Sequence, residues 1–237
     1  NLGKNMIKII CTVEKKENTS NVFYIDNSLG DSIAKKYNYA INNIILKQKE
    51  EICCFIHDDA EIINEETCEN KLKYIFKNNP TVGIVGVIGC LILEKNCTWW
   101  QTMRAPDGPC TFGNIIQGYN DGSEKIMSDD KGTCFDATTV DGCCMFFHKR
   151  VFENGLKFDE DLPRYHFYDA DICLQILSIG LDVCIADILI KHKSEGQLPS
   201  DWNTLKNLFY HKWTLKLNNE WPISRYSIRK FYGFIKK

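Results

Sequence analysis

Hydrophobic and polar positions follow two alternating periods through the first part of the chain. Apolar, β-branched runs at residues 6–13 and 21–26 predict strands, and residues 31–47 carry apolar side chains at helical spacing behind the candidate caps Asp31 and Ser32. The alternation continues with a strand at residues 51–59, a helix at about 65–78 and a buried strand at 82–89. This order predicts an α/β protein with a Rossmann-like, mostly parallel central sheet and helices on both of its faces.

The pattern changes after residue 93. Residues 94–133 follow neither period, which predicts a long functional loop. Strands are expected again at residues 137–150 and 181–190, with a helix between them that ends near Gly180, and residues 201–237 are expected to be helical. We therefore predict a main domain at residues 1–200 and a small helical extension at residues 201–237. Because the chain starts at Asn1 instead of Met, we expect it to be part of a longer protein in which the extension leads to a further domain.

Charge and cysteine content restrict the class of protein. The chain has 29 lysine and arginine residues against 31 aspartate and glutamate residues, so it lacks the basic balance of a nucleic-acid-binding protein. Its 12 cysteines form no Cys-x-x-Cys pair, which argues against a structural zinc site and favours reduced thiols. We find no signal peptide, and the apolar stretch at residues 82–93 is too short to span a membrane. We expect a cytoplasmic protein without a nucleic-acid partner.

Acidic side chains stand where predicted strands end. His57, Asp58 and Asp59 directly follow the apolar run at residues 52–56, and Asp26 ends the second predicted strand. Ligands of such sheets bind outside the carboxyl ends of the strands, and carboxylates there suit Mg²⁺ or Mn²⁺. The alternative is that these acids form a solvated turn or cap a helix.

Three further segments contain residues that could act in catalysis or binding. Asp169 and Asp171 stand among aromatic residues where a loop enters a helix, which suits a general base but also fits acids that favour a helix N-terminus. His192 follows a predicted strand and is either a ligand or a structural residue. Asp141 and Gly142 are compatible with an ordinary turn.

The order of these segments resembles the inverting, family 2-like glycosyltransferases of GT-A fold, and more narrowly the glycosyltransferase-like group of capsule and antibiotic-sugar pathways. The resemblance extends over about residues 37–196. Its segments are "KYNYAI", "FIHDDAEI", "VGIVGVIGC", "TWW", "VDGCCMFF", "HFYDADICL" and "HKSEG".

The resemblance implies a role for each matching residue. Asp59 and His192 would bind a divalent metal, Mn²⁺ or Mg²⁺, and Asp26, His57 and Asp58 would contact the nucleotide. His57 stands where the family has its first acid, and only residues 14–20 separate the first two strands, where the family has a helix. Both departures affect the nucleotide site.

The resemblance also implies a catalytic base and a substrate pocket. Asp169 matches the base that would deprotonate the acceptor hydroxyl. The residues expected in the sugar and acceptor pocket are Trp99, Trp100, Asp141, Gly142, His166 and Asp171.

The function implied is transfer of a sugar from a nucleoside-diphosphate sugar to a hydroxyl of a glycan or glycoconjugate, with inversion and with metal dependence. Two alternatives stay open: a nucleotidyltransferase, although no basic, glycine-rich phosphate loop is present, and a non-catalytic nucleotide-sugar or glycan-binding domain. Residues 221–237 mix aromatic residues with five basic residues and no acid, which predicts either contact with an anionic membrane surface or packing on the core.

Overall fold

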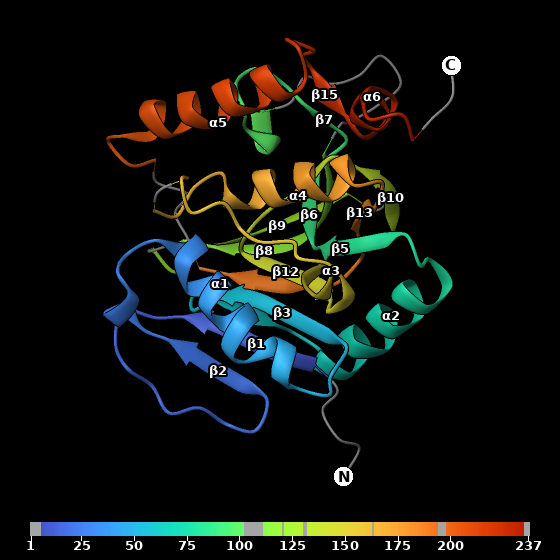
Figure 1. Ribbon diagram of the computed structural model, residues 1–237. Helices are drawn as coiled ribbons and strands as arrows, with labels where there is room; N and C mark the ends of the chain where they lie inside the picture. The colour runs from blue at the N-terminus through green and yellow to red at the C-terminus, as the bar shows by residue number, and fades with distance from the viewer. Residues whose placement is uncertain are drawn as a thin grey trace.

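Two β-sheets form the centre of the protein in a computed structural model that describes residues 6–101, 111–119, 121–129, 132–162, 164–193 and 198–234 (Figure 1). The larger sheet has the order β10 (Cys134–Ala137), β13 (Asp182–Ile185), β5 (Val82–Gly86), β12 (Cys144–His148), β3 (Ile52–His57), β1 (Met6–Cys11) and β2 (Val22–Ile25). The second sheet has the order β11 (Thr139–Val140), β6 (Ile88–Cys90), β8 (Thr111–Gly118), β14 (Ile190–His192) and β4 (Ala60–Ile62), with β9 (Glu124–Asp129) paired to β8. A small ladder joins β7 (Ile92–Leu93) to β15 (Ile223–Ser224).

The larger sheet is mostly parallel, as the sequence predicts. Strands β1, β2 and β3 pair in parallel, and β5 pairs in parallel with β13, whereas β12 is inserted antiparallel between β3 and β5. The helices are α1 (Ile33–Asn43), α2 (Glu65–Asn78), α3 (Arg150–Glu153), α4 (Tyr168–Ser178), α5 (Trp202–Lys216) and α6 (Arg225–Phe231), and 3₁₀ turns are η1 (Asn27–Leu29), η2 (Ile45–Lys47) and η3 (Trp99–Gln101). As expected, no helix separates β1 from β2.

Side chains of the central strands point alternately to the two faces of the large sheet. Phe55 and Phe147 belong to the core under α1 and α4, whereas Cys54 and Phe146 belong to the core shared with α2 and the second sheet. Both cores are closed by apolar side chains, so the strand run at residues 52–56 is buried on both sides.

The prediction of one long loop at residues 94–133 is wrong. Strands β8 and β9 lie within it and form an antiparallel hairpin. Their apolar signal is weak because β8 buries mainly Gly113, Ile115 and Gly118, and Ile126 and Met127 of β9 are exposed.

Two runs that were predicted as single strands are each divided between the two sheets. Residues 137–150 supply β11 to the second sheet and β12 to the large one, and the chain crosses between them at Asp141, Gly142 and Cys143. Residues 181–190 likewise divide into β13 and the start of β14. A continuous apolar run does not reveal which sheet each of its parts joins, because both parts are buried.

The described part of the predicted extension, residues 201–234, packs on the main core. Leu205, Phe209 and Trp213 of α5 are buried in the same cluster as α1 and α4, and β15 adds a short strand that the helical prediction omits. In Figure 1, α5 and α6 lie beside α4, at the end of the molecule away from β2.

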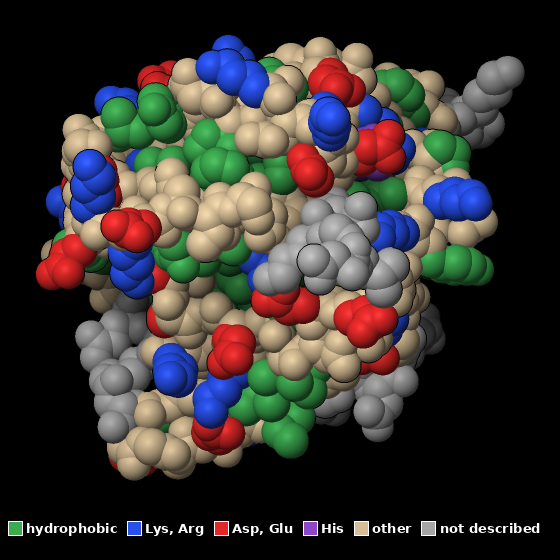
Figure 2. Space-filling view, turned by 90° about the horizontal axis from the view of Figure 1, so that it is seen from below, with side chains coloured by type: hydrophobic (Ala, Val, Ile, Leu, Met, Phe, Trp, Pro, Cys, Tyr) green, Lys and Arg blue, Asp and Glu red, His purple; other side chains and the backbone are tan. Residues whose placement is uncertain are grey.

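The surface shows no concentration of one charge on the face seen in Figure 2, where acidic and basic side chains are interspersed. This agrees with the near balance of 29 basic and 31 acidic residues. Among the described residues, no helix is both long and apolar enough to cross a membrane.

Candidate active site

Three side chains from two distant parts of the chain converge at one edge of the two sheets. His57 is the last residue of β3, Asp59 follows in the turn to β4, and His192 is the last residue of β14. Antiparallel pairing of β4 with β14 sets His192 opposite Ala60, and the amide of Lys193 donates to the carbonyl of Asp59 over 3.0 Å. The strand pairing therefore brings the imidazole of His192 to the carboxylate of Asp59.

The geometry of these three side chains fits a cation site. One ligand atom from each of His57, Asp59 and His192 lies within 4.8 Å of the other two. Asp59 Oδ1 is 3.4 Å from His192 Nε2 and 4.0 Å from His57 Nδ1. His192 Nε2 is buried and faces the Asp59 carboxylate at ion-pair distance, without a well-aligned hydrogen bond to a described residue. Buried ring nitrogens that face a carboxylate in this way are typical of the ligand set of a divalent cation.

Burial and the neighbouring groups shift the pKa of each of these three side chains. Burial lowers the pKa of His57, so its imidazole is neutral at pH 7. The neighbouring His192 lowers the pKa of Asp59. Burial would lower the pKa of His192, but its interaction with Asp59 and the charge of Asp141 outweigh burial and raise that pKa. A proton on His192 is thus the competitor that a cation must displace.

A pair of carboxylates stands beside the histidines. Asp141 lies in the crossing from β11 to β12, where Oδ1 accepts from the Cys143 amide and Oδ2 from the Trp99 indole, over 2.8 and 2.9 Å. Asp169 lies in the first turn of α4 and accepts from the amides of Gly142 and Ala170, over 2.9 and 2.8 Å. Burial, and then the charge of Asp141, raise the pKa of Asp169 to about 7. A carboxylate with this pKa is a stronger base than an ordinary aspartate and still ionises near neutral pH.

The two histidines and the two carboxylates face one cavity of about 420 Å³. His57, His192, Asp141 and Asp169 all line it. Its other lining residues are largely aromatic. They include Trp99, Trp100, Tyr119, Tyr165, His166, Phe167, Tyr168 and Trp202. The described lining residues include no lysine or arginine.

Most of the residues predicted for the sugar and acceptor pocket do line this cavity, and their roles stay predictions. Trp99, Trp100, Asp141, Gly142 and His166 are all among its lining residues. His166 packs against the ring of Trp202, with centroids 5.0 Å apart.

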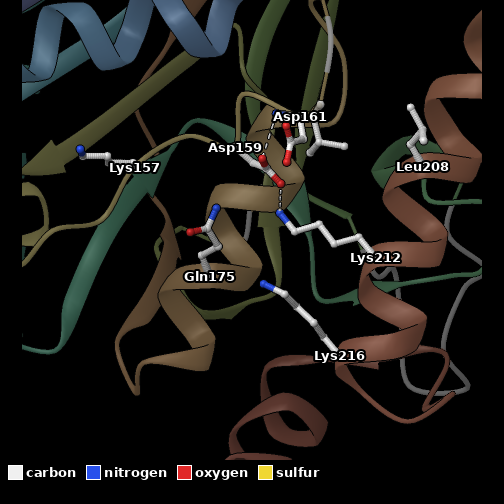
Figure 3. Close-up of a pocket in the computed structure, with 8 residues that line it drawn as sticks. Lys157, Asp159, Asp161, Gln175, Leu208, Lys212 and Lys216 are labelled. Atoms are coloured by element: carbon white, nitrogen blue, oxygen red, sulfur yellow. Dashed lines mark hydrogen bonds and ion pairs between the residues drawn. The ribbon is translucent and has the colours of Figure 1, made fainter.

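Asp171 does not line the cavity, although the resemblance implied a pocket role. Its carboxylate is fully buried and accepts from the Trp213 indole over 2.8 Å, from Gln175 over 2.7 Å and from Lys212. Lys212 also bonds Asp159 and belongs to a separate hollow of about 550 Å³ between α4 and α5 (Figure 3). Asp171 therefore anchors α5 to α4, on the side of the helix away from Asp169.

The predicted nucleotide contacts are more scattered. His57 belongs to the cluster with Asp59 and His192, whereas the exposed Asp58 does not. Asp26 lies at the end of the edge strand β2, where its carboxylate accepts from the Ser28 amide over 2.9 Å, and it does not line the cavity. Their role in nucleotide binding stays a prediction.

Sequence reasoning missed several lining residues, among them Tyr168, Tyr165 and Trp202. Tyr168 stands next to Asp169 in the segment that the sequence did single out, and Tyr165 directly precedes that segment, so proximity to a candidate base was a usable signal. Trp202 lies at the start of α5, and only tertiary packing shows that it reaches His166, Phe167 and Trp100.

Comparison with known proteins identifies the family of this chain. A protein-family profile described as "Glycosyltransferase like family" matches residues 8–213. The chain belongs to this family. A search of curated protein sequences gave no match.

Several solved structures resemble this chain at low sequence identity. The mannosyltransferase PcManGT from Pyrobaculum calidifontis, in complex with GDP-Man and Mn²⁺, aligns over 97% of this chain and 68% of its own, with a TM-score of 0.52 and 12% identity. S. aureus TarS 1–349 aligns over 90% of this chain and 52% of its own (TM-score 0.49, 13% identity), and GalNAc-T7 with UDP, GalNAc and Mn²⁺ over 90% and 43% (TM-score 0.49, 11% identity). The chain thus spans about half the length of TarS 1–349 and less than half of GalNAc-T7. At these identities the likeness to PcManGT shows the GT-A type fold alone.

The candidate cation site generates a first prediction. His57→Ala, Asp59→Asn and His192→Ala should each weaken Mn²⁺ binding at least tenfold in calorimetric titration, because each removes one of three ligands. Affinity of the unaltered chain should fall as the pH is lowered, since His192, with its raised pKa, must lose a proton to bind. The exposed neighbour Asp58 supplies the control, and Asp58→Asn should bind like the unaltered chain. Equal loss in Asp58→Asn, or no loss in the other three, would contradict the assignment.

Proposed function

We propose that this chain is a metal-dependent, inverting glycosyltransferase that moves a sugar from a nucleoside diphosphate to a hydroxyl group of a glycan or glycoconjugate. The observation that carries the proposal is that His57 and His192, which form a cluster with Asp59, line one cavity together with Asp169. The cluster of His57, Asp59 and His192 suits the leaving diphosphate, and Asp169 suits the attacking hydroxyl. Membership of a glycosyltransferase-like family supports the same reaction.

The lining of the cavity supports metal dependence. A departing diphosphate develops negative charge, and Asp141 and Asp169 would repel it, while the described lining residues offer no lysine or arginine against it. His57, Asp59 and His192 would hold the cation, which when bound supplies Lewis-acid stabilisation of the leaving group. Two of the three ligands are imidazoles, which Mg²⁺ binds poorly. We therefore favour Mn²⁺ over Mg²⁺.

Asp169 is the proposed base. Its carboxylate is held by the amides of Gly142 and Ala170, which orient it within the cavity. The proton of the acceptor hydroxyl passes to Asp169 as the oxygen attacks the anomeric carbon from the face opposite the diphosphate. A single displacement of this kind inverts the anomeric configuration. Asp141 is held in a similar way, by the Trp99 indole and the Cys143 amide, so we prefer Asp169 because it matches the base that the family resemblance implies and because burial raises its pKa to about 7.

The aromatic wall of the cavity suits sugar rings. Trp202 is far in sequence from the adjacent Trp99 and Trp100, but the three rings form one cluster. The centroids are 5.7 Å apart for Trp99 and Trp100 and 5.8 Å apart for Trp100 and Trp202. Flat apolar rings offer large contact area at little cost in conformational entropy, and polar groups at the ring edges can bind hydroxyls. This favours a glycan as the acceptor.

The direct test is hydrolysis of nucleoside-diphosphate sugars without an acceptor, after a thermal-shift panel has selected the donor. We expect release of free sugar and nucleoside diphosphate with Mn²⁺, slower release with Mg²⁺ and none with a chelator. NMR of the early product should show an anomeric configuration opposite to that of the donor. Donor binding without turnover would indicate a binding domain, and cleavage that releases nucleoside monophosphate would indicate a phosphoryl-transfer enzyme.

The base assignment predicts a separation of binding from turnover. Asp169→Asn should lower kcat about 10²-fold or more and leave the donor Kd nearly unchanged, because the base acts on the acceptor. The rate of the unaltered chain should rise about tenfold per pH unit below pH 7 and level off above it, since the pKa of Asp169 is about 7 and only the ionised form accepts a proton.

Asp171 provides the matched control for Asp169. Asp171→Asn should lower the melting temperature, because Lys212 and the Trp213 indole lose a buried partner, and should retain kcat at temperatures where it is folded. Normal turnover in Asp169→Asn, or a loss of kcat in folded Asp171→Asn, would overturn the assignment.

Contact of residues 221–237 with a membrane stays a prediction, and the packing of the described residues 221–234 favours the alternative. Arg225 and Arg229 both bind the buried Asp182, and Ile228 is buried against the core, so two of the basic residues are already neutralised. We expect the chain to stay in the supernatant with neutral and with anionic liposomes. Cosedimentation with anionic liposomes at low salt that is lost at high salt would support the membrane surface instead.

A further inference from the structure

A path of hydrogen bonds joins the candidate base to the cation-ligand cluster through a single peptide group. The amide of Gly142 donates to Asp169 Oδ2 over 2.9 Å. Its carbonyl accepts from the hydroxyl of Tyr168 over 3.2 Å, and the same hydroxyl lies 2.7 Å from His57 Nε2. Tyr168 thus stands directly between Gly142 and one of the three ligands.

The donor and acceptor chemistry gives this path a direction. A carbonyl can only accept, so the bond to Gly142 uses the single proton of the Tyr168 hydroxyl. The hydroxyl oxygen must then accept from His57, which puts the imidazole proton on Nε2. His57 Nδ1 is left with a free lone pair, and Nδ1 is the atom that faces Asp59 Oδ1 at 4.0 Å.

The surroundings hold Tyr168 rigidly in this position. Its side chain is buried, and the rings of Tyr37 and Phe158 pack against it with centroids 5.8 and 6.2 Å away. Phe167, the residue before it, has a φ of 64°, a left-handed conformation that sets the entry of the chain into α4. A Cβ on Gly142 would lie 2.2 Å from the Tyr168 hydroxyl, so the close contact requires glycine at that position.

We propose that Tyr168 is a positioning residue that fixes the tautomer and the ring orientation of His57, so that Nδ1 is presented to a divalent cation. The proposal rests on the cation site of the proposed function but not on sugar transfer. Partners of this kind in metal sites commonly contribute a factor of 10 to 100 to metal affinity. Tyr168 itself does not coordinate the cation.

The first test uses the unaltered chain without metal, at a pH where His57 is neutral. Long-range ¹H–¹⁵N NMR, with His57 assigned through His57→Gln, should show a protonated Nε2 and an unprotonated Nδ1. In Tyr168→Phe the His57 signals should shift toward a mixture of tautomers. Protonation at Nδ1 in the unaltered chain would overturn the proposal. This NMR measurement requires neither a bound metal nor enzymatic activity.

The second test measures Mn²⁺ affinity by calorimetry and the Mn²⁺ EPR signal of the bound ion. Tyr168→Phe should bind Mn²⁺ 10- to 100-fold more weakly than the unaltered chain, with an altered EPR signal. Tyr165→Phe is the matched control, because Tyr165 lines the same cavity but its hydroxyl bonds Lys36, and its Mn²⁺ affinity should be unchanged. Thermal melts establish that both variants are folded.

The outcomes separate this inference from the proposed function. Mn²⁺ affinity within twofold of the unaltered chain in folded Tyr168→Phe would overturn the positioning role, while donor hydrolysis with Mn²⁺ could still succeed. Failure of donor hydrolysis with every metal, combined with the expected tautomer and the expected loss of affinity, would overturn the transferase proposal and leave the positioning role of Tyr168 intact.

Discussion

The crossing of the chain from β11 to β12 is the constraint on which the candidate site depends. At Asp141, Gly142 and Cys143 the backbone leaves the second sheet and enters the large one, and each residue is tied to a different neighbour. The Asp141 amide donates to the carbonyl of Ile88, and the carbonyl of Cys143 accepts from the amide of His57. The close fit also depends on Gly89, where a Cβ would lie 2.0 Å from the carbonyl oxygen of Thr139. This crossing places the Asp141 carboxylate in the cavity and binds Asp169 through the Gly142 amide. The Gly142 carbonyl also accepts from the hydroxyl of Tyr168, which contacts His57.

Asp169 and Asp171 show how two positions on one helix acquire different chemistry. Residues two apart in a helix point to nearly opposite sides of it. Asp171 faces α5 and receives Lys212 and the Trp213 indole, so its charge is compensated within the core. Asp169 faces the cavity, where backbone amides orient it but Asp141 adds a second negative charge, and its pKa rises to about 7. The difference arises from what each side of α4 packs against, not from the local sequence.

The proposed cation site follows a similar logic. Asp59 and His192 meet because β4 and β14 pair antiparallel in the second sheet, and His57 meets them because β3 ends at the same edge. The imidazole of His57 takes the position in which the family resemblance implies an acid. A neutral imidazole there reduces the negative charge of the cluster, and its hydrogen bonds decide which of its two ring nitrogens carries the proton. In the proposed site, the contact between His57 and Tyr168 therefore affects cation binding. A carboxylate at this position has no tautomers, so it would not depend on such a contact.

The sequence by itself determined the parts of this protein that depend on local pattern. The alternation of apolar periods predicted the parallel core of the large sheet and helices α1, α2 and α4. Polar residues after buried strands drew attention to His57, Asp59 and His192, and an acid among aromatic residues at the start of a helix drew attention to Asp169. The sequence did not predict the second sheet, because β8 and β9 carry few buried apolar side chains and β11 and β14 are continuous in sequence with strands of the other sheet. Only the tertiary structure decided that His57 joins Asp59 and His192, that Asp171 is a core anchor, and that Tyr168 and Trp202 reach the cavity. Each of these rests on a contact between residues far apart in the chain, which strand pairing and core packing create and which no short-range period records.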